Sequence, residues 1–427
     1  MKTQRVKHPP VRRQVLFPRA KLDADALIVV SRLKRHGHQA YLVGGCVRDL
    51  LLGRRPKDFD VATDATPEEV KALFRRRCRI IGRRFRLAHV HFGPKIIETA
   101  TFRANPHSNN PSCDTVGTPG SESERPDEPA ASTTQPLDLG PSDSLLIKRD
   151  NVFGSAEEDA LRRDFTINGL FYDPQTQEVI DYVQGLADIE ARLVRTIGDP
   201  EIRFREDPVR ILGAIKFAAR LDMTIEERTH DAMITFREQI RYCAKARVFE
   251  EIRRLLSEGA SRASIDGAQS VDVLEVLSEP VAKALETPVL AGRIRKRLAA
   301  ADRMKRSGIE LSRALVFTNL VTEILGRDWM NAADPSRALD QRLTPILADM
   351  NTPKRDMDRA RKILMLQRRL LSRKSRRPSM ARSEAFPEAL QLFELAHMAG
   401  LIQERETLDY WKKRLRIPRD RRGGRRR

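Results

Sequence analysis

The sequence of 427 residues contains few cysteines, few aromatic side chains and no long apolar run. Its four cysteines (Cys46, Cys78, Cys113 and Cys243) are widely scattered, which argues against a disulfide framework or a structural zinc site and favours the reducing cytoplasm. No apolar run reaches the ~18 residues needed to cross a bilayer, so no membrane span is expected. The basic stretch from Met1 to Lys21 lacks the apolar segment and cleavage site of a signal peptide.

Positive charge, by contrast, is in excess. The chain has 79 Lys and Arg against 59 Asp and Glu, and four runs hold much of this charge: residues 1–22, 71–86, 359–377 and 411–427. Residues 104–144 are acidic and rich in Pro, Ser, Gly and Thr, which predicts a disordered insertion. Without that segment, 78 basic and 52 acidic residues remain, a net charge of +26. One basic run can be a solvated helix face, but four favour a surface that binds a polyanion through its phosphates.

The length predicts more than one domain. The N-terminal third mixes strand and helix signals, and the pattern from about residue 207 to residue 414 is almost wholly helical. We therefore expect an α/β head, in which a small mixed sheet carries flanking helices, followed by an all-α neck and body. The expected segments are a basic tail at 1–22, the head at 23–195 with its disordered acidic insertion at 104–144, the neck at 196–262, the body at 263–415 and a basic tail at 416–427.

The most informative motif is Gly44-Gly45-Cys46-Val47-Arg48-Asp49, followed by Lys57-Asp58-Phe59-Asp60. Asp58 and Asp60 alternate with Phe59 along an expected strand, so both carboxylates project to the same side. Two such carboxylates repel each other unless a cation lies between them, and Mg²⁺ prefers one or two carboxylates together with substrate phosphates. Two glycines at the start of a helix allow a phosphate to approach the backbone. The alternative is a solvated strand end. The sequence has no Gly-x-x-x-x-Gly-Lys-Ser/Thr loop, which excludes a P-loop NTPase.

These residues resemble the nucleotidyltransferase superfamily of DNA polymerase β, and within it the bacterial tRNA nucleotidyltransferase/poly(A) polymerase family. The resemblance implies that Gly44 and Gly45 hold an incoming triphosphate, with Arg48 of the same motif also assigned to the nucleotide. It implies that Asp58 and Asp60 bind two Mg²⁺ ions and that Glu98, in Ile97-Glu98-Thr99, completes the carboxylate set. The alternative for Glu98 is an exposed position at a hairpin edge.

Two further motifs match the same family. Arg162-Arg163-Asp164-Phe165-Thr166-Ile167-Asn168-Gly169 implies a catalytic role for Asp164 near the ribose and phosphate binding by both arginines, although a structural salt-bridge cluster is the alternative. Asp207 and Arg210 share one helix face and would hydrogen-bond the incoming base, or else form a surface ion pair. Relatives usually carry a basic residue where this chain has Gly213.

The resemblance implies template-independent transfer of AMP from ATP to RNA 3′ ends, that is, polyadenylation. The segments Ile80–Gly93 and Lys148–Ser155 and the arginine-rich C-terminal region resemble those of bacterial poly(A) polymerases, and CCA-adding relatives are usually less basic in the first of them. This resemblance favours a poly(A) polymerase over a CCA-adding tRNA enzyme, which is the main alternative. A non-catalytic RNA-binding protein is the alternative from another class. RNA phosphates are expected to contact Arg83, Arg84, Arg86, Arg368, Arg369, Lys412 and Lys413. RNA-decay or RNA-chaperone proteins are candidate partners.

Overall fold

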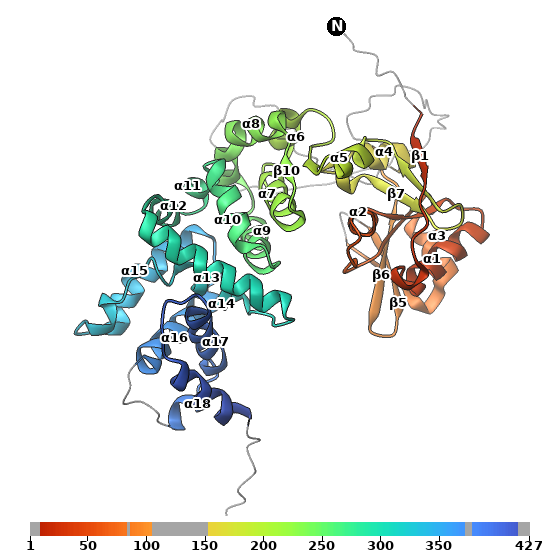
Figure 1. The fold of residues 1–427 in the computed structure, drawn as a ribbon. Helices are drawn as coiled ribbons and strands as arrows, with labels where there is room; N and C mark the ends of the chain where they lie inside the picture. Colours follow the sequence, from red (N-terminus) through yellow and green to blue (C-terminus); the bar gives the residue numbers. More distant parts are fainter. Residues whose placement is uncertain (1–8, 83–85, 105–152, 372–377, 417–427) are drawn as a thin grey trace, which may run out of the picture.

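The computed structural model describes residues 9–82, 86–104, 153–371 and 378–416. In this part of the chain a sheet-containing head is followed by a long run of helices (Figure 1). The sequence prediction of an α/β head with an all-α neck and body is therefore confirmed. The predicted acidic insertion at 104–144 lies outside the described residues apart from its first residue, and so does the C-terminal tail from residue 417. The domain boundaries stay predictions.

The head is organised around one mixed sheet, with eight strands among the described residues and the order β1-β8-β7-β2-β3-β6-β5-β4. The strands are β1 Val11–Gln14, β2 Ala40–Val43, β3 Asp60–Thr63, β4 Cys78–Ile81, β5 Leu87–Phe92, β6 Lys95–Thr101, β7 Leu170–Asp173 and β8 Glu178–Asp181. The head helices are α1 Ala24–Arg35, α2 Gly45–Leu51, α3 Pro67–Phe74, α4 Ala156–Leu161 and α5 Gly185–Glu190.

The register at the centre of the sheet places the acidic residues of the sequence motifs beside each other. Strand β2 pairs antiparallel with β3, so that Val43 lies opposite Asp60. Strand β3 pairs parallel with β6, so that Val61 lies opposite Thr99. The residues that precede this pair, Asp60 and Glu98, are therefore neighbours on the same face of the sheet.

The two faces of the sheet are covered differently. Helices α1 and α3 pack on one face and form the main core with buried residues such as Val29, Leu42 and Val61. The other face carries a smaller apolar cluster, to which α4 contributes Ala156 and Ala160. Asp60 lies directly opposite Val43, a member of this smaller cluster, so the acidic residues are on the less covered face.

Local sequence signals account for the helices that begin near the motifs. Thr66 and Glu69 form a complete capping box at the start of α3, with Pro67 in the first turn, as the sequence predicts. Helix α2 follows Gly44 and is followed in turn by Gly53, whose φ of 71° lies in the left-handed region. The sequence pattern of the N-terminal third predicts strands at residues 39–43, 59–62, 79–81, 87–92 and 96–102, and these are confirmed to within one or two residues.

One prediction for the head needs correction. Residues 11–14 lie in the segment expected to be a basic tail, but they form strand β1, which pairs with β8 at the edge of the sheet. Val11 and the two arginines that follow it are exposed, which is tolerated at an edge strand. The sequence does not predict this strand, because three of its four residues are polar and it lacks the alternation of apolar and polar residues.

The remainder of the described chain is helical, apart from a short parallel pair between β9 (Leu193–Val194) and β10 (Thr224–Ile225). The helices are α6 Pro200–Glu206, α7 Arg210–Leu221, α8 Glu227–Phe236, α9 Lys245–Ser257, α10 Ser261–Ser270, α11 Val273–Leu277, α12 Glu279–Glu286, α13 Pro288–Arg306, α14 Arg313–Val321, α15 Pro335–Asp349, α16 Lys354–Leu370, α17 Phe386–Met398 and α18 Arg405–Arg416. Among the residues described, none of these helices combines the length and apolar character that a membrane crossing needs.

Helix α5 packs closely against the segment Thr166–Asn168, which belongs to the motif of residues 162–169. A substitution at this contact tests whether the close packing stabilises the fold. A Cβ atom at Gly185 would lie 2.3 Å from the carbonyl oxygen of Thr166. We expect Gly185→Ala to lower the free energy of unfolding by about 1–3 kcal/mol, because the backbone must shift. Gly292→Ala is the matched control, since nothing lies within 4 Å of its Cβ position in α13, and we expect it to be neutral or stabilising. Equal effects in urea unfolding would contradict this account.

Candidate active site

The centre of the candidate site is the acidic edge formed by Asp58, Asp60 and Glu98. Burial, the neighbouring Glu98 carboxylate and Asp58 together raise the pKa of Asp60 to about 6, although Arg163 acts in the opposite direction. Asp58 and Glu98 have side chains that are 75% and 55% exposed, so both remain accessible to a ligand. The nearest ion-pairing groups are the Lys57 ammonium, 3.8 Å from Asp58, and the His89 ring, 3.8 Å from Glu98.

These carboxylates are suited to share a cation without enclosing it. In the described part of the chain, no group of three or more Asp, Glu, His or Cys side chains is arranged to hold a metal ion by itself. A magnesium ion commonly takes only one or two carboxylates and completes its shell with water and substrate phosphates. Burial raises the pKa of Asp60 most and the Glu98 and Asp58 carboxylates add to this, so a bound cation would relieve the part that comes from the neighbouring negative charges. The donor set therefore fits a divalent cation bound together with a phosphorylated substrate.

The Gly-Gly turn lies next to the acidic edge. Gly44 follows β2 and has φ 72° and ψ −130°, a conformation that disfavours any residue with a side chain. A Cβ atom at Gly44 would also lie 2.9 Å from Nη1 of Arg163, so the guanidinium lies directly beside the turn and would have to shift if residue 44 had a side chain. The turn thus brings the start of α2 and a guanidinium together, which is an arrangement suited to an anion.

Arg162 and Arg163 are held by a carboxylate that the sequence motifs did not single out. Asp159, in α4, accepts from Nη2 of Arg163 at 2.9 Å and from Nε of Arg162 at 3.3 Å. Arg163 also donates to the carbonyl oxygen of Asn168 and packs over the ring of Phe171. The available signal was spacing, because Asp159 precedes the two arginines by three and four residues.

Asp164 is part of a hydrogen-bonded chain that ends at Arg48. Its Oδ1 accepts from the backbone N–H of Phe165 at 2.7 Å and from Nδ2 of Asn168 at 3.1 Å. The Asn168 Oδ1 in turn accepts from Nη1 of Arg48 at 2.5 Å. Asn168 therefore fixes the relative positions of Asp164 and the helix that follows the Gly-Gly turn.

Arg48 is buried, so its side chain is not open to a ligand. Its side chain is only 3% exposed, donates to Asp49 at 2.7 and 2.8 Å and to Asn168, and stacks over the ring of Phe217. Burial lowers the pKa of this guanidinium. The contacts of Arg48 thus favour a supporting role, in contrast to the direct contact with a nucleotide that the resemblance implies.

The neck pair predicted from sequence lies close together, but not on one helix face: Asp207 follows the end of α6 with a non-helical backbone (φ −154°, ψ 86°), and Arg210 begins α7. Nε of Arg210 lies 3.6 Å from Oδ2 of Asp207, and Arg247 from α9 also pairs with that oxygen. Arg210 makes a second contact with Glu206 at 3.4 Å. Arg247 and Asp207 are 40 positions apart, so only the tertiary structure reveals this contact.

Gly213 of the neck helix α7 lies against the motif of residues 162–169. A Cβ atom at Gly213 would lie 3.4 Å from the ring of Phe165, next to Asp164. One turn further along α7, Lys216 is buried and its ammonium pairs with Glu251 at 2.7 Å. The ammonium of Lys216 is therefore paired within the neck.

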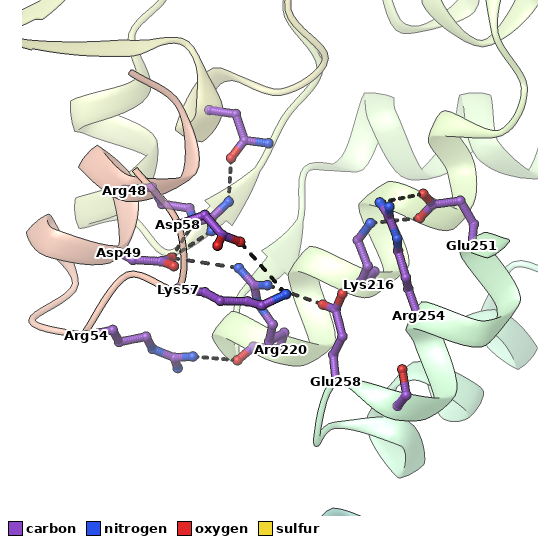
Figure 2. Close-up of polar contacts among 12 residues, drawn as sticks. Arg48, Asp49, Arg54, Lys57, Asp58, Lys216, Arg220, Glu251, Arg254 and Glu258 are labelled. Carbon is purple, nitrogen blue, oxygen red and sulfur yellow. Dashed lines mark hydrogen bonds and ion pairs between the residues drawn. The ribbon is translucent and has the colours of Figure 1, made fainter. Parts of the chain in front are cut away.

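Polar contacts join the head to the neck around this site (Figure 2). Asp49 lies 3.8 Å from Arg220, which also pairs with Glu258 at 3.2 Å. Arg54 donates to the carbonyl oxygen of Arg220 at 2.7 Å, at the C-terminal end of α7. Arg203 of α6 donates to the carbonyl oxygens of Arg162 and Arg163. These contacts connect the two motifs of the head to the helix that carries Arg210.

The residues expected to contact RNA are placed variously. Arg83 and Arg84 lie outside the described residues, and Arg86 pairs with Glu68. Arg368 and Arg369 are exposed on α16, and Lys413 is exposed on α18. Lys412 pairs with Glu394. Exposed basic residues are thus present on the helical body as well as on the head.

Comparisons with known proteins agree with this arrangement. A family model described as "Poly A polymerase head domain" matches residues 40–195, and one described as "Probable RNA and SrmB- binding site of polymerase A" matches residues 222–285. The fold is similar to that of the CCA-adding enzyme of Bacillus stearothermophilus solved with CTP, with a TM-score of 0.62, 23% identity and coverage of 91% of this chain and 81% of that one. Fold and site together thus define a nucleotidyltransferase head joined to a helical body.

The sequence relatives define the group more narrowly. Poly(A) polymerase I of Salmonella typhi is 49% identical over 248 residues, which is 58% of this chain and 48% of that protein. The CCA-adding enzyme of Lactobacillus delbrueckii is 31% identical over 76% of this chain and 71% of its own length. The chain belongs to the tRNA nucleotidyltransferase/poly(A) polymerase family. It spans about half the length of the curated poly(A) polymerases that it matches.

The raised pKa of Asp60 predicts a measurable effect on stability. A carboxyl group whose pKa is higher in the folded state than in the unfolded state destabilises the fold progressively as pH rises from about 4 to about 7. Without divalent cations, Asp60→Asn should therefore be more stable than the wild type at pH 7.5, by on the order of 1 kcal/mol after allowance for solvent screening. The difference should disappear near pH 4.

Thermal unfolding in EDTA across this pH range measures the effect. Asp231→Asn is the control, because Asp231 is 73% exposed on α8 and outside the acidic edge. Parallel stability curves for the wild type and Asp60→Asn would contradict the proposed repulsion.

Proposed function

We propose that this protein is a template-independent polynucleotide adenylyltransferase, which adds AMP from ATP to RNA 3′ ends and so synthesises poly(A) tails. The observation that carries the proposal is the acidic edge of Asp58, Asp60 and Glu98 beside the Gly44 turn and Arg163. The greater identity to poly(A) polymerases (46–49%) than to CCA-adding enzymes (31–33%) supports adenylate as the transferred group.

The proposed cofactor is Mg²⁺, with two ions held by Asp58, Asp60 and Glu98. Bound there, the cation would supply positive charge to the oxygens of the reacting phosphate. The protein residues contribute position: Asp60 and Glu98 are fixed by the parallel pairing of β3 and β6. Exposed Asp58 precedes that strand on the side from which a substrate can enter.

The nucleotide would be held by groups from the head and the neck. Gly44 and Gly45 allow the triphosphate to approach the start of α2, and Arg162 and Arg163 supply guanidinium groups oriented by Asp159. Asp164, fixed by Asn168, is assigned to the ribose.

Asp207 and Arg210 are assigned to the edge of the adenine. Their acceptor and donor groups can pair with the exocyclic amine and a ring nitrogen of that base. Arg247 would orient Asp207 for this contact.

RNA would be held mainly by its phosphates on exposed basic residues of the body, such as Arg368, Arg369 and Lys413. Binding of this kind weakens steeply as the salt concentration increases and carries little sequence preference. The free thiols of Cys46 and Cys78 suit a reducing compartment, and we propose the cytoplasm as the site of action.

CCA addition to tRNA is the second candidate function. It is favoured by the fold, which is similar to that of the Thermotoga maritima CCA-adding enzyme solved with tRNA, with a TM-score of 0.56 and 19% identity. The contact between Gly213 and Phe165 lies next to the base-recognition pair, so it bears on the choice between ATP and CTP. A non-catalytic RNA-binding protein is disfavoured, because it would have no reason to retain the repelling carboxylates of the acidic edge.

Incorporation of single nucleotides distinguishes these functions. With Mg²⁺ and a short unstructured RNA, we expect repeated AMP addition from ATP and little transfer from CTP. The ATP reaction should be lost in Asp60→Ala and retained in the control Asp231→Ala, while filter retention of RNA is unchanged in both. CMP addition followed by a single AMP, restricted to tRNA-like ends, would establish the second candidate instead, and full activity of Asp60→Ala would refute the role of the acidic edge.

A further inference from the structure

One face of strands β4, β5 and β6 is exposed beside the acidic edge. Arg79 and Ile81 of β4 and Ile96 and Glu98 of β6 are exposed, and the residues that alternate with them are less exposed. The buried residues of these strands belong to the main core, and α1 and α3 lie on that side of β5 and β6 (Figure 1). We call the exposed surface the open face. It consists of Arg79, Ile81, Leu87, His89, His91, Ile96 and Glu98.

The register of the sheet leads across the open face to the acidic edge. Arg79 lies opposite His89, and His89 lies opposite Glu98. Paired residues project to the same face and adjacent strands are ~5 Å apart, so the backbone of Arg79 is on the order of 10 Å from that of Glu98. Successive phosphates of one stacked strand advance by ~3.4 Å, so a few nucleotides span this distance.

The open face and the segment before it carry unpaired positive charge. Arg75, Arg76 and Arg77 precede β4 and are exposed, as is Arg79. None of these four arginines pairs with a carboxylate among the described residues. Glu98 is the one acidic residue in the sequences of β4, β5 and β6. The charge of this surface therefore matches a polyanion.

Apolar side chains are exposed on the same face. Ile81 is 46% exposed and Ile96 is 43% exposed. Ile96 lies opposite the partly exposed His91. Unstacked bases of single-stranded RNA pack on aromatic and apolar side chains, while its phosphates contact arginines. A single-stranded polynucleotide would use both kinds of group, whereas a simple anion would leave the isoleucines uncovered.

The position of the Gly44 turn gives the direction from which RNA would approach. Strands β3 and β6, which carry Asp60 and Glu98, lie between β2, which precedes the turn, and β5 with β4. In phosphoryl transfer the attacking and leaving oxygens lie roughly in line on opposite sides of the phosphorus. With the triphosphate at the Gly44 turn, pyrophosphate would leave on the β2 side. The RNA 3′-oxygen would then form its bond to the α-phosphorus from the β5 side.

We propose that the open face binds the 3′-terminal nucleotides of the RNA, with a phosphate on Arg79 and bases packed on Ile81 and Ile96. This inference rests on the proposed function, because it locates the RNA end that receives AMP. It adds a surface on the head to the basic residues of the body, which would hold the RNA further from its 3′ end.

Photo-cross-linking locates the RNA end without requiring transfer. Oligo(A) that carries 4-thiouridine as its last residue, mixed with the full-length protein and Mg²⁺, should cross-link within residues 78–98. The same RNA with 4-thiouridine at its 5′ end should not. A 3′ label that cross-links only outside residues 78–98, or equal cross-linking there by both labels, would overturn the proposal and leave the face to a protein partner.

Arg79→Ala should raise the KM for RNA about fivefold, while the KM for ATP stays close to that of the wild type. It should also reduce the slope of log K against log salt for RNA binding by about 0.7, as expected for one phosphate contact with a single strand. The matched control is Arg35→Ala, because Arg35 is an exposed arginine of α1, on the other side of the sheet. Equal effects of the two substitutions would overturn the proposal.

Ile81→Asp tests the apolar part of the open face. We expect it to raise the KM for RNA about fivefold, because it removes a packing surface and adds a charge that repels phosphate. Ile28→Asp is the matched control, since Ile28 is 48% exposed on α1. Unchanged RNA binding in both Arg79→Ala and Ile81→Asp would overturn the proposal. A wild type that adds no AMP would refute the proposed function instead, and the cross-linking result would still locate the RNA.

Discussion

The placement of the Asp60 and Glu98 carboxylates on neighbouring strands is the constraint on which the site depends. It is imposed by the parallel pairing of β3 with β6, which places like charges on the less covered face of the sheet. The pKa of Asp60 is raised mainly by burial and further by the Glu98 carboxylate, and Arg163 offsets only part of the shift. A fold that keeps such a destabilising arrangement has a reason to do so when a bound cation and a phosphorylated substrate remove the repulsion.

The residues around this pair of carboxylates are held in fixed positions by hydrogen bonds to one another. Nη1 of Arg163 lies beside the Gly44 turn and donates to the carbonyl oxygen of Asn168, while another donor of the guanidinium is taken by Asp159. Asn168 then links Asp164 to the buried Arg48. The same chain of contacts continues through Asp49 and Arg220 to the neck (Figure 2), so the proposed base-recognition residues are held in a defined relation to the acidic edge.

Much of the head could be predicted from sequence because its signals are local. The capping box at Thr66, the glycine after α2 and the alternation around Phe59 each act within a few residues. Strand β1 was missed because its polar residues carry no apolar alternation, and its pairing partner β8 is more than 160 positions away. The burial of Arg48 could not be predicted for a related reason: its contacts with Asn168 and Phe217 are tertiary, whereas a motif reports only residue type.

The central claim is that these carboxylates bind a divalent cation. The most direct test is to measure how many protons are released when the metal binds. Calorimetric titration with Mg²⁺ and a non-hydrolysable ATP analogue near pH 6, in buffers of different ionisation enthalpy, gives this number. We predict that the wild type releases about half a proton more than Asp60→Asn, because a group with a pKa of about 6 is half protonated there. The excess should vanish at pH 8. Equal proton release by the two proteins near pH 6 would contradict the account.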